Sequence, residues 1–410
     1  MQPKELRTWL HLLDSVGRAA ARRLLARHGD AEAVLNAGQA GWTGLVTADE
    51  AQRLRHGPPK LEQTWHRTQA WLEASDTHSV LLLGDPDYPP SLLHTADPPL
   101  MLYLDGRREL LGRRAIAVVG SRHPTPQGED NARMFAAGLG QAGFCVVSGL
   151  AMGIDGAAHE ASLNTAGGTV AVLGTGLDQV YPLAHEALAR HISRRGLLVS
   201  EYFIGTPPLA PNFPQRNRII AGLAEGCLVV EAAMKSGSLI TARMASEAGR
   251  EVFAIPGSIH APQSRGCHHL LKQGACLVQT LEDLLSELPP TDRPNAQTEH
   301  PASPTHPSGT TPRPASATAV PGPGPLTAPA NDAVGKPAKD AGGQPADPAD
   351  TANPTHPVLR ALGHDPISLE QLSQRTGWSV NELAAVLLDL ELEGEVARLP
   401  GARFQRRVRA

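Results

Sequence analysis

The chain has 410 residues, 19% of them charged, and a formal net charge of −4 at pH 7. A chain of this length commonly forms two or three domains. Its mildly negative charge argues against a surface that is basic throughout, so any contact with nucleic acid must come from a local basic patch. The four cysteines lack a C-x-x-C spacing, so the sequence indicates neither a disulfide framework nor a zinc ribbon.

The N-terminal stretch, "MQPKELRTWLHLLDSVG", is charged and has no apolar signal core. No stretch of the sequence approaches the roughly 18 consecutive apolar residues that cross a bilayer. We therefore expect a soluble, cytoplasmic protein that makes no membrane contact.

Residues 1–75 predict a small helical domain, because leucines recur at helical intervals and Gly17 and Gly29 mark turns. The stretch "SVGRAAARRLLARHG" resembles a helix-hairpin-helix or sterile-alpha-motif-like turn that leads into a basic helix. Two interpretations follow from this resemblance. Either the turn holds a DNA backbone through its N–H groups, or the helices form a bundle that packs on the main domain.

Residues 76–288 predict an α/β core, because short and nearly continuous apolar runs alternate with amphipathic helices. We expect strands at 115–120, 144–149, 168–174, 197–202, 226–232, 250–257 and 275–280. This alternation is typical of an extended Rossmann-like fold, a doubly wound parallel sheet covered on both faces. In such folds ligands bind beyond the carboxyl ends of the strands.

The loops that follow these strands carry the candidate ligand-binding residues. They read "GSRHPTPQG", "SGLAMGIDGAAHEA", "GTGLDQVYP", "SEYFIGTPPLAPNFPQRNRIIAGL" and "EAAMKSGSLITA". Small residues let a ligand approach the backbone closely, and helix N-termini supply N–H donors. Arg122, Arg216, Arg218 and Lys235 all follow strands at this edge, which predicts a local positive groove suited to phosphate.

Motifs of nucleotide-dependent enzymes are missing or incomplete. There is no G-x-x-x-x-G-K-[ST], and "GTGLDQ" lacks the third glycine of a dinucleotide fingerprint. Asp155 and His159 lie one helical turn apart and could form an acid/base pair; we favour the interpretation that Asp155 caps the helix and His159 bonds nearby. We expect no metal site, since the adjacent Cys267, His268 and His269 have no distant fourth ligand.

Two carboxylates, Glu201 and Glu231, each end a predicted strand. They could be the catalytic groups of a sugar-phosphate hydrolase. The interpretation that we favour makes them acceptors for loop N–H groups or partners of Arg216 and Arg218.

Residues 289–356 are rich in Pro, Ala, Thr and Gly and predict a disordered, semi-extended linker. Residues 357–410 then predict a winged-helix-like domain, with Ser368 and Ser379 as N-caps and Gly377 at the turn. Its second helix, "VNELAAVLLDLELEG", carries four acidic residues and no Lys or Arg. An acidic helix is a poor reader of DNA, so this domain is interpreted as a protein-interaction module, although the basic "RFQRRVR" remains able to touch phosphates.

Six blocks of the core occur in an order that resembles the DNA-processing protein A family, also called DprA or Smf. Besides the loops quoted above they include "GGTVAVLGTGLDQVYP", "VVEAAMKSGSLITARMASEAGREVFAIPG" and "GCHHLLKQGA", and together they span about residues 80–285. The family's layout, a helical N-terminal domain, an extended Rossmann-like core and often a C-terminal winged helix, fits the domains predicted above. His185 and His268 stand where the family commonly has Asn.

The resemblance implies a non-enzymatic protein that binds single-stranded DNA and protects incoming strands during natural transformation. It also implies help in loading the RecA recombinase, a homodimer formed through the Rossmann-like domain, and no cofactor. On this resemblance the DNA pocket is lined by Arg122 of "GSR" and Lys235 before "SGS". Further DNA-binding candidates are Ser121, Ser236, Gly237, Ser238, Arg216, Asn217 and Arg218. The alternative is a Rossmann-like, phosphoribohydrolase-type enzyme that cleaves nucleotides, with Glu231 as its carboxylate.

Overall fold

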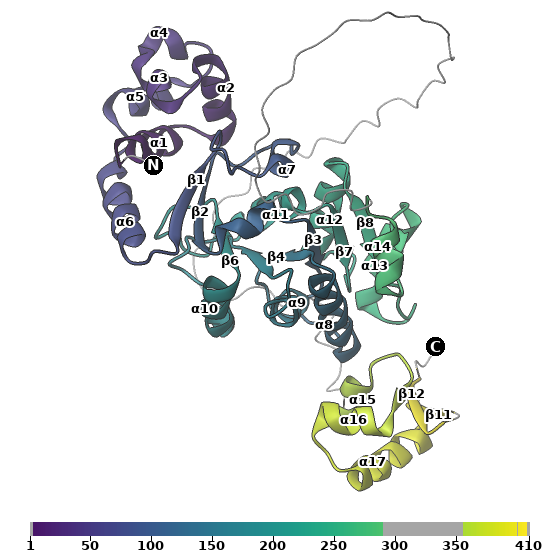
Figure 1. Ribbon diagram of the computed structural model, residues 1–410. Helices are drawn as coiled ribbons and strands as arrows, with labels where there is room; N and C mark the ends of the chain where they lie inside the picture. The colour runs from purple at the N-terminus through teal and green to yellow at the C-terminus, as the bar shows by residue number, and fades with distance from the viewer. Residues whose placement is uncertain (1–2, 290–355, 400, 408–410) are drawn as a thin grey trace, which may run out of the picture. The chain divides into compact units, whose positions relative to one another are not determined.

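The computed structural model describes residues 3–289, 356–399 and 401–407. The N-terminal helices form a bundle (Figure 1): α1 (Pro3–Ser15), α2 (Arg18–His28), α3 (Ala31–Asn36), α4 (Gly38–Trp42), α5 (Ala48–His56) and α6 (Leu61–Glu73). Leucines and tryptophans on their inner faces are buried, among them Leu10, Leu24 and Trp42. This burial explains the helical periodicity of the leucines.

The core holds a nine-stranded sheet with the order β1-β2-β6-β5-β4-β3-β7-β8-β9. Its parallel strands are β3 (Ala115–Val119), β4 (Cys145–Ser148), β5 (Thr169–Val172), β6 (Leu197–Ser200), β7 (Gly226–Val229), β8 (Glu251–Ala254) and β9 (Cys276–Leu277). All seven lie within the ranges that the apolar runs predict. The Rossmann-like, mostly parallel sheet is therefore confirmed.

Strands β1 (His78–Leu82) and β2 (Met101–Gly106) were not predicted and extend the sheet at one edge. Strand β1 pairs antiparallel with β2, and β2 pairs antiparallel with β6. Between the two strands lies the short helix α7 (Pro90–Leu93).

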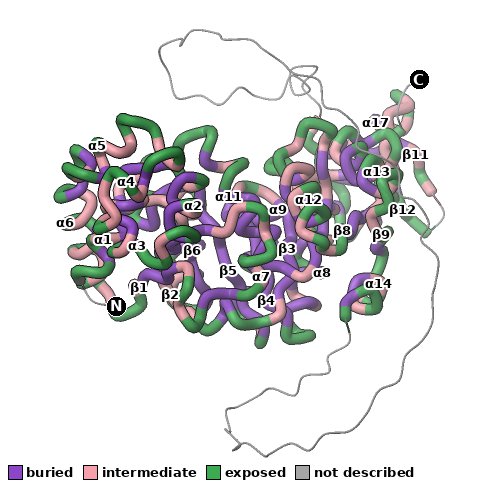
Figure 2. Tube along the Cα trace, turned by 90° about the horizontal axis from the view of Figure 1, so that it is seen from above, coloured by how far each residue is buried: buried purple, intermediate pink, exposed green. Residues whose placement is uncertain are grey.

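Helices cover both faces of the sheet, because successive strand residues point to opposite faces. On one face Ala115 and Ala117 pack with helices α11 (Asn212–Leu223), α12 (Gly237–Glu247) and α13 (Arg265–Lys272). On the other face Ile116 and Val118 pack with α8 (Pro126–Gln141), α9 (Ile154–Ser162) and α14 (Leu281–Ser286). Figure 2 shows the buried residues running along the strands between these two layers. Helix α10 (Glu186–Arg195) packs near β6 in the cluster that also includes the N-terminal bundle.

The C-terminal residues form a winged helix. Helices α15 (Pro357–Leu362), α16 (Leu369–Thr376) and α17 (Val380–Leu392) accompany the strands β10 (Ile367–Ser368), β11 (Val396–Leu399) and β12 (Arg403–Arg406). Ser368 and Ser379 each complete a capping box, and Gly377 ends α16 in the left-handed conformation. The predicted caps and turn are confirmed. The predicted linker, 289–356, lies outside the described residues except at its two ends.

None of the helices that the structure describes is long and apolar enough to cross a membrane.

Candidate nucleic-acid interface

The sheet reverses its winding direction between β3 and β7. From β3 the chain proceeds through β4, β5 and β6 on one side, then returns to place β7 and β8 on the other. The loops after β3 and after β7 therefore diverge and leave a crevice at the carboxyl edge, which is the usual ligand position in such sheets. These are the loops that carry "GSR" and "KSGS".

The loop after β3 is held close to the start of α9 and leaves one cation exposed. A Cβ at Gly120 would lie 2.6 Å from the side chain of Ile154, so only glycine fits there. The carbonyl of Ser121 accepts a hydrogen bond from Ile154 N at 3.1 Å, and Ser121 Oγ accepts one from His123 N at 3.1 Å. Arg122 is exposed and forms no ion pair within the described residues.

The loop after β7 leads directly into the N-terminus of α12. Ser236 is the N-cap, and its Oγ accepts from Ser238 N at 3.3 Å. Its hydroxyl lies 2.7 Å from that of Ser238. Lys235 and Gly237 are exposed, and no atom lies within 4 Å of the Cβ position of Gly237. The helix dipole favours an anion here, and Lys235 adds a full charge.

Arg216 lies beneath the loops, only 5% exposed. Its Nη1 donates to the carbonyl of Gly149 at 2.6 Å and to that of Val172, while its Nε donates to Asn217 Oδ1 at 2.9 Å. Asn217 in turn donates to the carbonyl of Gly237 at 3.4 Å. Burial lowers the pKa of Arg216 to about 10, Asp155 raises it, and the charge of Arg122 lowers it further. The guanidinium therefore stays charged at neutral pH and joins the ends of β4 and β5 to α12.

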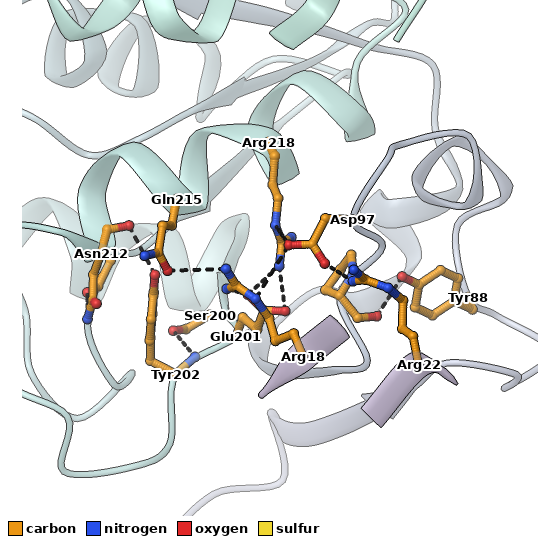
Figure 3. A network of polar contacts seen from close by, with 12 residues as sticks. Arg18, Arg22, Tyr88, Asp97, Ser200, Glu201, Tyr202, Asn212, Gln215 and Arg218 are labelled. Carbon is orange, nitrogen blue, oxygen red and sulfur yellow. Dashed lines mark hydrogen bonds and ion pairs between the residues drawn. The ribbon is translucent and has the colours of Figure 1, made fainter. Parts of the chain in front are cut away.

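Arg218 belongs to a second cluster, which faces the N-terminal bundle (Figure 3). Its Nη2 donates to both oxygens of Glu201 at 2.6 Å, and its Nε donates to Asp97 at 3.0 Å. From α2, Arg18 Nη1 reaches Glu201 at 2.9 Å, and Arg22 pairs with Asp97. Three guanidinium groups thus share two carboxylates.

These contacts bear on the two interpretations of the N-terminal domain. Two basic side chains of α2, Arg18 and Arg22, pack the bundle on the core, which favours the second interpretation, whereas Arg23 donates to the carbonyl of Leu45 within the bundle. The pairing of Arg18 and Arg22 with Asp97 and Glu201 was not predicted, because no local pattern links residues so far apart in the sequence.

Asp155 and His159 are both buried and have structural partners. Asp155 accepts from Gly149 N at 3.0 Å and from Ala151 N at 3.4 Å, whereas Gly153 is the N-cap of α9. The expectation that Asp155 is the cap was therefore wrong, because the preceding loop turns its N–H groups toward this carboxylate. Burial is the main cause that raises the pKa of Asp155.

His159 has its two ring nitrogens occupied. Thr169 donates its hydroxyl to Val146 O, so it accepts from His159 Nδ1 at 2.7 Å, and His159 Nε2 accepts from Leu150 N at 3.3 Å. Burial lowers the pKa of His159 to about 3. The ring is neutral, and by accepting from Leu150 N it holds the loop that follows β4.

Glu231 joins β7 to the start of α8. It accepts from Thr125 N at 2.9 Å and from Thr125 Oγ1 at 2.6 Å, and Thr125 Oγ1 caps α8 by accepting from Gly128 N at 3.0 Å. Burial raises the pKa of Glu231, and the two bonds from Thr125 act in the opposite direction. The interpretations of Glu231 as an acceptor for a loop N–H group and of Glu201 as a partner of Arg218 are confirmed.

The other histidines and cysteines in the part of the chain that the structure describes show no metal-binding arrangement. Cys267 is fully buried, and His268 Nε2 lies 3.1 Å from the carbonyl of Gly257. Within the described ranges no group of three or more His, Cys, Asp or Glu residues could hold a metal ion. His185 Nδ1 lies 3.0 Å from the carbonyl of Leu150 and thus helps to fix the loop after β4.

The sequence comparisons point to one family. Residues 79–289 match the family model described as DNA recombination-mediator protein A, and residues 343–402 match the DprA winged helix domain. Protein Smf of Escherichia coli is 39% identical over 361 residues, which cover 88% of this chain and 84% of that protein. DNA processing protein DprA of Streptococcus pneumoniae is 49% identical over 203 residues, which cover 50% of this chain and 72% of that protein.

A solved structure agrees with these sequence matches. The X-ray structure of DNA processing protein A from Streptococcus pneumoniae superposes with a TM-score of 0.56 at 37% identity, over 70% of this chain and 99% of that one. The family model spans more than half of the chain, and it includes both loops of the switch point. This chain therefore belongs to the DNA recombination-mediator protein A family.

Proposed function

We propose that this recombination mediator holds single-stranded DNA in the crevice between the loops after β3 and β7. The observation that carries the proposal is the pair of exposed cations, Arg122 and Lys235, on either side of the switch point. Phosphates of the strand contact these two side chains and the N-terminus of α12. Ser121 and Ser236 supply hydroxyls, and Gly237 lets the DNA backbone approach closely. Ser238 is only 7% exposed, and its hydroxyl positions that of Ser236 at 2.7 Å.

Burial supports different roles for the other three candidates. Arg216, Asn217 and Arg218 are each at most 9% exposed and already bond to protein groups. In our proposal Arg216 and Asn217 position the loops and add positive potential beneath the strand, while Arg218 anchors the N-terminal bundle.

A single strand fits this site better than a duplex. Base readout in a duplex requires a helix or a β-ribbon that enters the major groove, whereas the candidate cations sit on short loops at a sheet edge. In the winged helix, α17 is the helix that follows the turn at Gly377. It exposes Glu382 and Asp389, which would repel phosphates. We therefore keep α17 as a protein-interaction surface.

We also propose that the protein is not an enzyme. Glu231 has both oxygens engaged by Thr125, and Asp155 and His159 are enclosed and bonded to the loop backbone. A nucleotide-cleaving enzyme would need a carboxylate free to touch its substrate.

The experiment is a binding titration run beside an activity assay. Labelled oligonucleotides, single-stranded and duplex, are titrated with the protein, and nucleoside monophosphates are incubated with it and assayed for free base. We expect tighter binding of the single strand and no base release. Base release that is lost in Glu231→Gln would instead establish the nucleotide-cleaving enzyme.

The remaining parts of the proposal follow the family resemblance. We propose that the protein acts in the cytoplasm, dimerises through the Rossmann-like core and delivers the strand to RecA. We keep 1–75, 76–288, 289–356 and 357–410 as the helical domain, core, linker and winged helix. Measuring the mass in solution with and without an oligonucleotide tests dimerisation, and a pull-down with purified RecA tests the second partner.

A further inference from the structure

Exposed apolar side chains recur along the carboxyl edge of the sheet. The loops that follow β4, β5, β6, β7 and β8 each present one large hydrophobic residue that is at least 42% exposed: Met152, Leu183, Leu209, Met234 and Ile259. Isolated exposed hydrophobic residues are common on soluble proteins. Five such residues along the carboxyl edge of one sheet indicate a ligand with an apolar part.

The two methionines lie beside the two exposed cations. Met234, 50% exposed, directly precedes Lys235. Met152, 42% exposed, precedes Gly153, whose Cβ position lies 2.5 Å from the carbonyl oxygen of Ser121 and 2.9 Å from the carbonyl carbon of Arg122. Because β4 and β7 both neighbour β3, the loops with Met152 and Met234 leave the sheet on either side of the Arg122 loop. Met234 is thus the chain neighbour of Lys235, and Met152 belongs to the turn that packs against the backbone of the Arg122 loop.

The aromatic side chains near this edge have packing partners within the protein, although Tyr181, Tyr202, Phe203 and Phe213 are only half-buried. Tyr202 donates its hydroxyl to the carbonyl of Asn212 at 3.0 Å. The ring of Phe213 lies 5.3 Å from that of Tyr181 and 2.9 Å from the Cβ position of Gly174. Single-strand binders usually stack bases on aromatic rings, and here the more exposed apolar side chains of Met152 and Met234 offer the bases a further surface.

We propose that Met152 and Met234 are the base-contacting residues of this site, and that their thioethers lie against nucleobases whose phosphates bind Arg122 and Lys235. This inference rests on the proposed function. Sulfur is polarizable and contacts aromatic rings favourably, and the unbranched side chain adapts to any base. Binding is therefore tolerant of sequence, and oxidation to the polar sulfoxide weakens it.

The test is carried out on the full chain. Fluorescence anisotropy at low salt measures binding to an oligothymidylate and to an abasic oligonucleotide of the same length. The double variant Met152→Ala/Met234→Ala is expected to bind the oligothymidylate about tenfold more weakly, and to bind the abasic strand as the wild type does. Met134→Ala is the matched control, since Met134 is 56% exposed two turns into α8 and is expected to change neither affinity.

An oxidant gives a second readout. Peroxide treatment is expected to weaken wild-type binding to the oligothymidylate. The variant Met152→Leu/Met234→Leu is expected to bind with the affinity of the untreated wild type, both before and after peroxide treatment. Equal losses of the double alanine variant on both strands, or no loss on either, overturn the inference. A changed mass of that variant with unchanged affinity also overturns it, and assigns the methionines to an interface between copies. A wild type that binds neither strand refutes the proposed function itself.

Discussion

Burial divides the four cations at the carboxyl edge of the sheet into two pairs. Arg122 and Lys235 are exposed, whereas Arg216 and Arg218 are 5% and 9% exposed and bond to carbonyl and carboxylate oxygens. An exposed cation can exchange water for a phosphate oxygen, but a buried one would have to leave its protein partners uncompensated. Only the first pair is therefore placed to gain from direct contact with DNA.

A substitution at Gly237 is expected to change DNA binding without lowering the stability of the protein. No atom lies within 4 Å of its Cβ position, and its φ is not positive, so Gly237→Ala is expected to leave the thermal unfolding temperature unchanged or slightly raised. If a DNA backbone approaches this residue, the added methyl group weakens single-strand binding by about tenfold, or ~1.4 kcal/mol. Calorimetry and an anisotropy titration check the two expectations. Unchanged affinity would remove Gly237 from the interface.

His159 makes stability depend on pH. Its pKa falls from 6.5 to about 3 on folding, so between these values the unfolded chain binds a proton that the folded chain does not. The free energy of unfolding therefore decreases as the pH falls below 6.5, by up to about 1.4 kcal/mol per pH unit from this residue. His159→Gln, less stable at pH 7, is expected to show a shallower decrease between pH 6 and pH 4.

Denaturant titrations of both proteins at several pH values measure this difference. Asp155, whose raised pKa acts in the opposite direction, is present in both and is removed by the subtraction. Parallel pH profiles would show that His159 does not titrate as its burial implies.

At the scale of elements, the buried Arg216 holds the loop after β4 through a hydrogen bond to the carbonyl of Gly149. A Cβ at Gly149 would lie 2.2 Å from Arg216 Nη2, so Gly149→Ala must displace the guanidinium from the carbonyls of Gly149 and Val172. A buried cation without its acceptors costs about 3 kcal/mol. The control is Gly112→Ala, where no atom lies within 4 Å of the Cβ position.

Urea unfolding of the two glycine variants measures this cost. A Gly149→Ala variant as stable as Gly112→Ala would mean that Arg216 does not hold the loop in place.

The sequence predicts the elements whose burial or helix capping leaves a pattern in neighbouring residues. Strands β3 to β7 are buried on both faces and therefore read as continuous apolar runs, and the caps at Ser368 and Ser379 have a local signature. Strands β1 and β2 were missed because they form an antiparallel extension separated by the Pro- and Asp-rich "GDPDYPP". That stretch resembles ordinary loop sequence.

The candidate site was predictable in position but not in detail. Strand ends in a parallel sheet meet at one edge, so Arg122 and Lys235 could be placed there from the sequence. Which cations are buried depends on partners such as Gly149 and Val172, which lie 67 and 44 residues from Arg216. Such long-range contacts leave no pattern in a single sequence.

At the scale of the whole molecule, the N-terminal bundle is joined to the core by charge as well as by their shared hydrophobic cluster. Glu201 is the shared partner of Arg18 from α2 and Arg218 from α11, and the side chains of Glu201 and Arg218 are each only 10% exposed. Removing one partner from a buried pair leaves an uncompensated charge. Glu201→Gln is therefore expected to lower the free energy of unfolding by about 3 kcal/mol.

The matched control is Glu32→Gln, which breaks an exposed pair with Lys4 whose side chains are 61% and 81% exposed. Its expected cost is under about 1 kcal/mol. Chemical denaturation of both variants makes the comparison, and equal costs would show that the bundle does not depend on this cluster.

The central claim, that Arg122 and Lys235 bind the phosphates of a single strand, is tested most directly by the salt dependence of binding. The affinity for an oligothymidylate is measured across salt concentrations for wild type, Arg122→Ala and Lys235→Ala. The control is Arg243→Ala, which removes an exposed cation that pairs with Glu247 farther along α12. The slope is that of the logarithm of the binding constant against the logarithm of the salt concentration, and it is negative. We predict that Arg122→Ala and Lys235→Ala each reduce its magnitude by about 0.7, the value for one phosphate contact to a single strand, and that the control keeps the wild-type slope. Slopes that stay at the wild-type value in Arg122→Ala and Lys235→Ala would contradict the account.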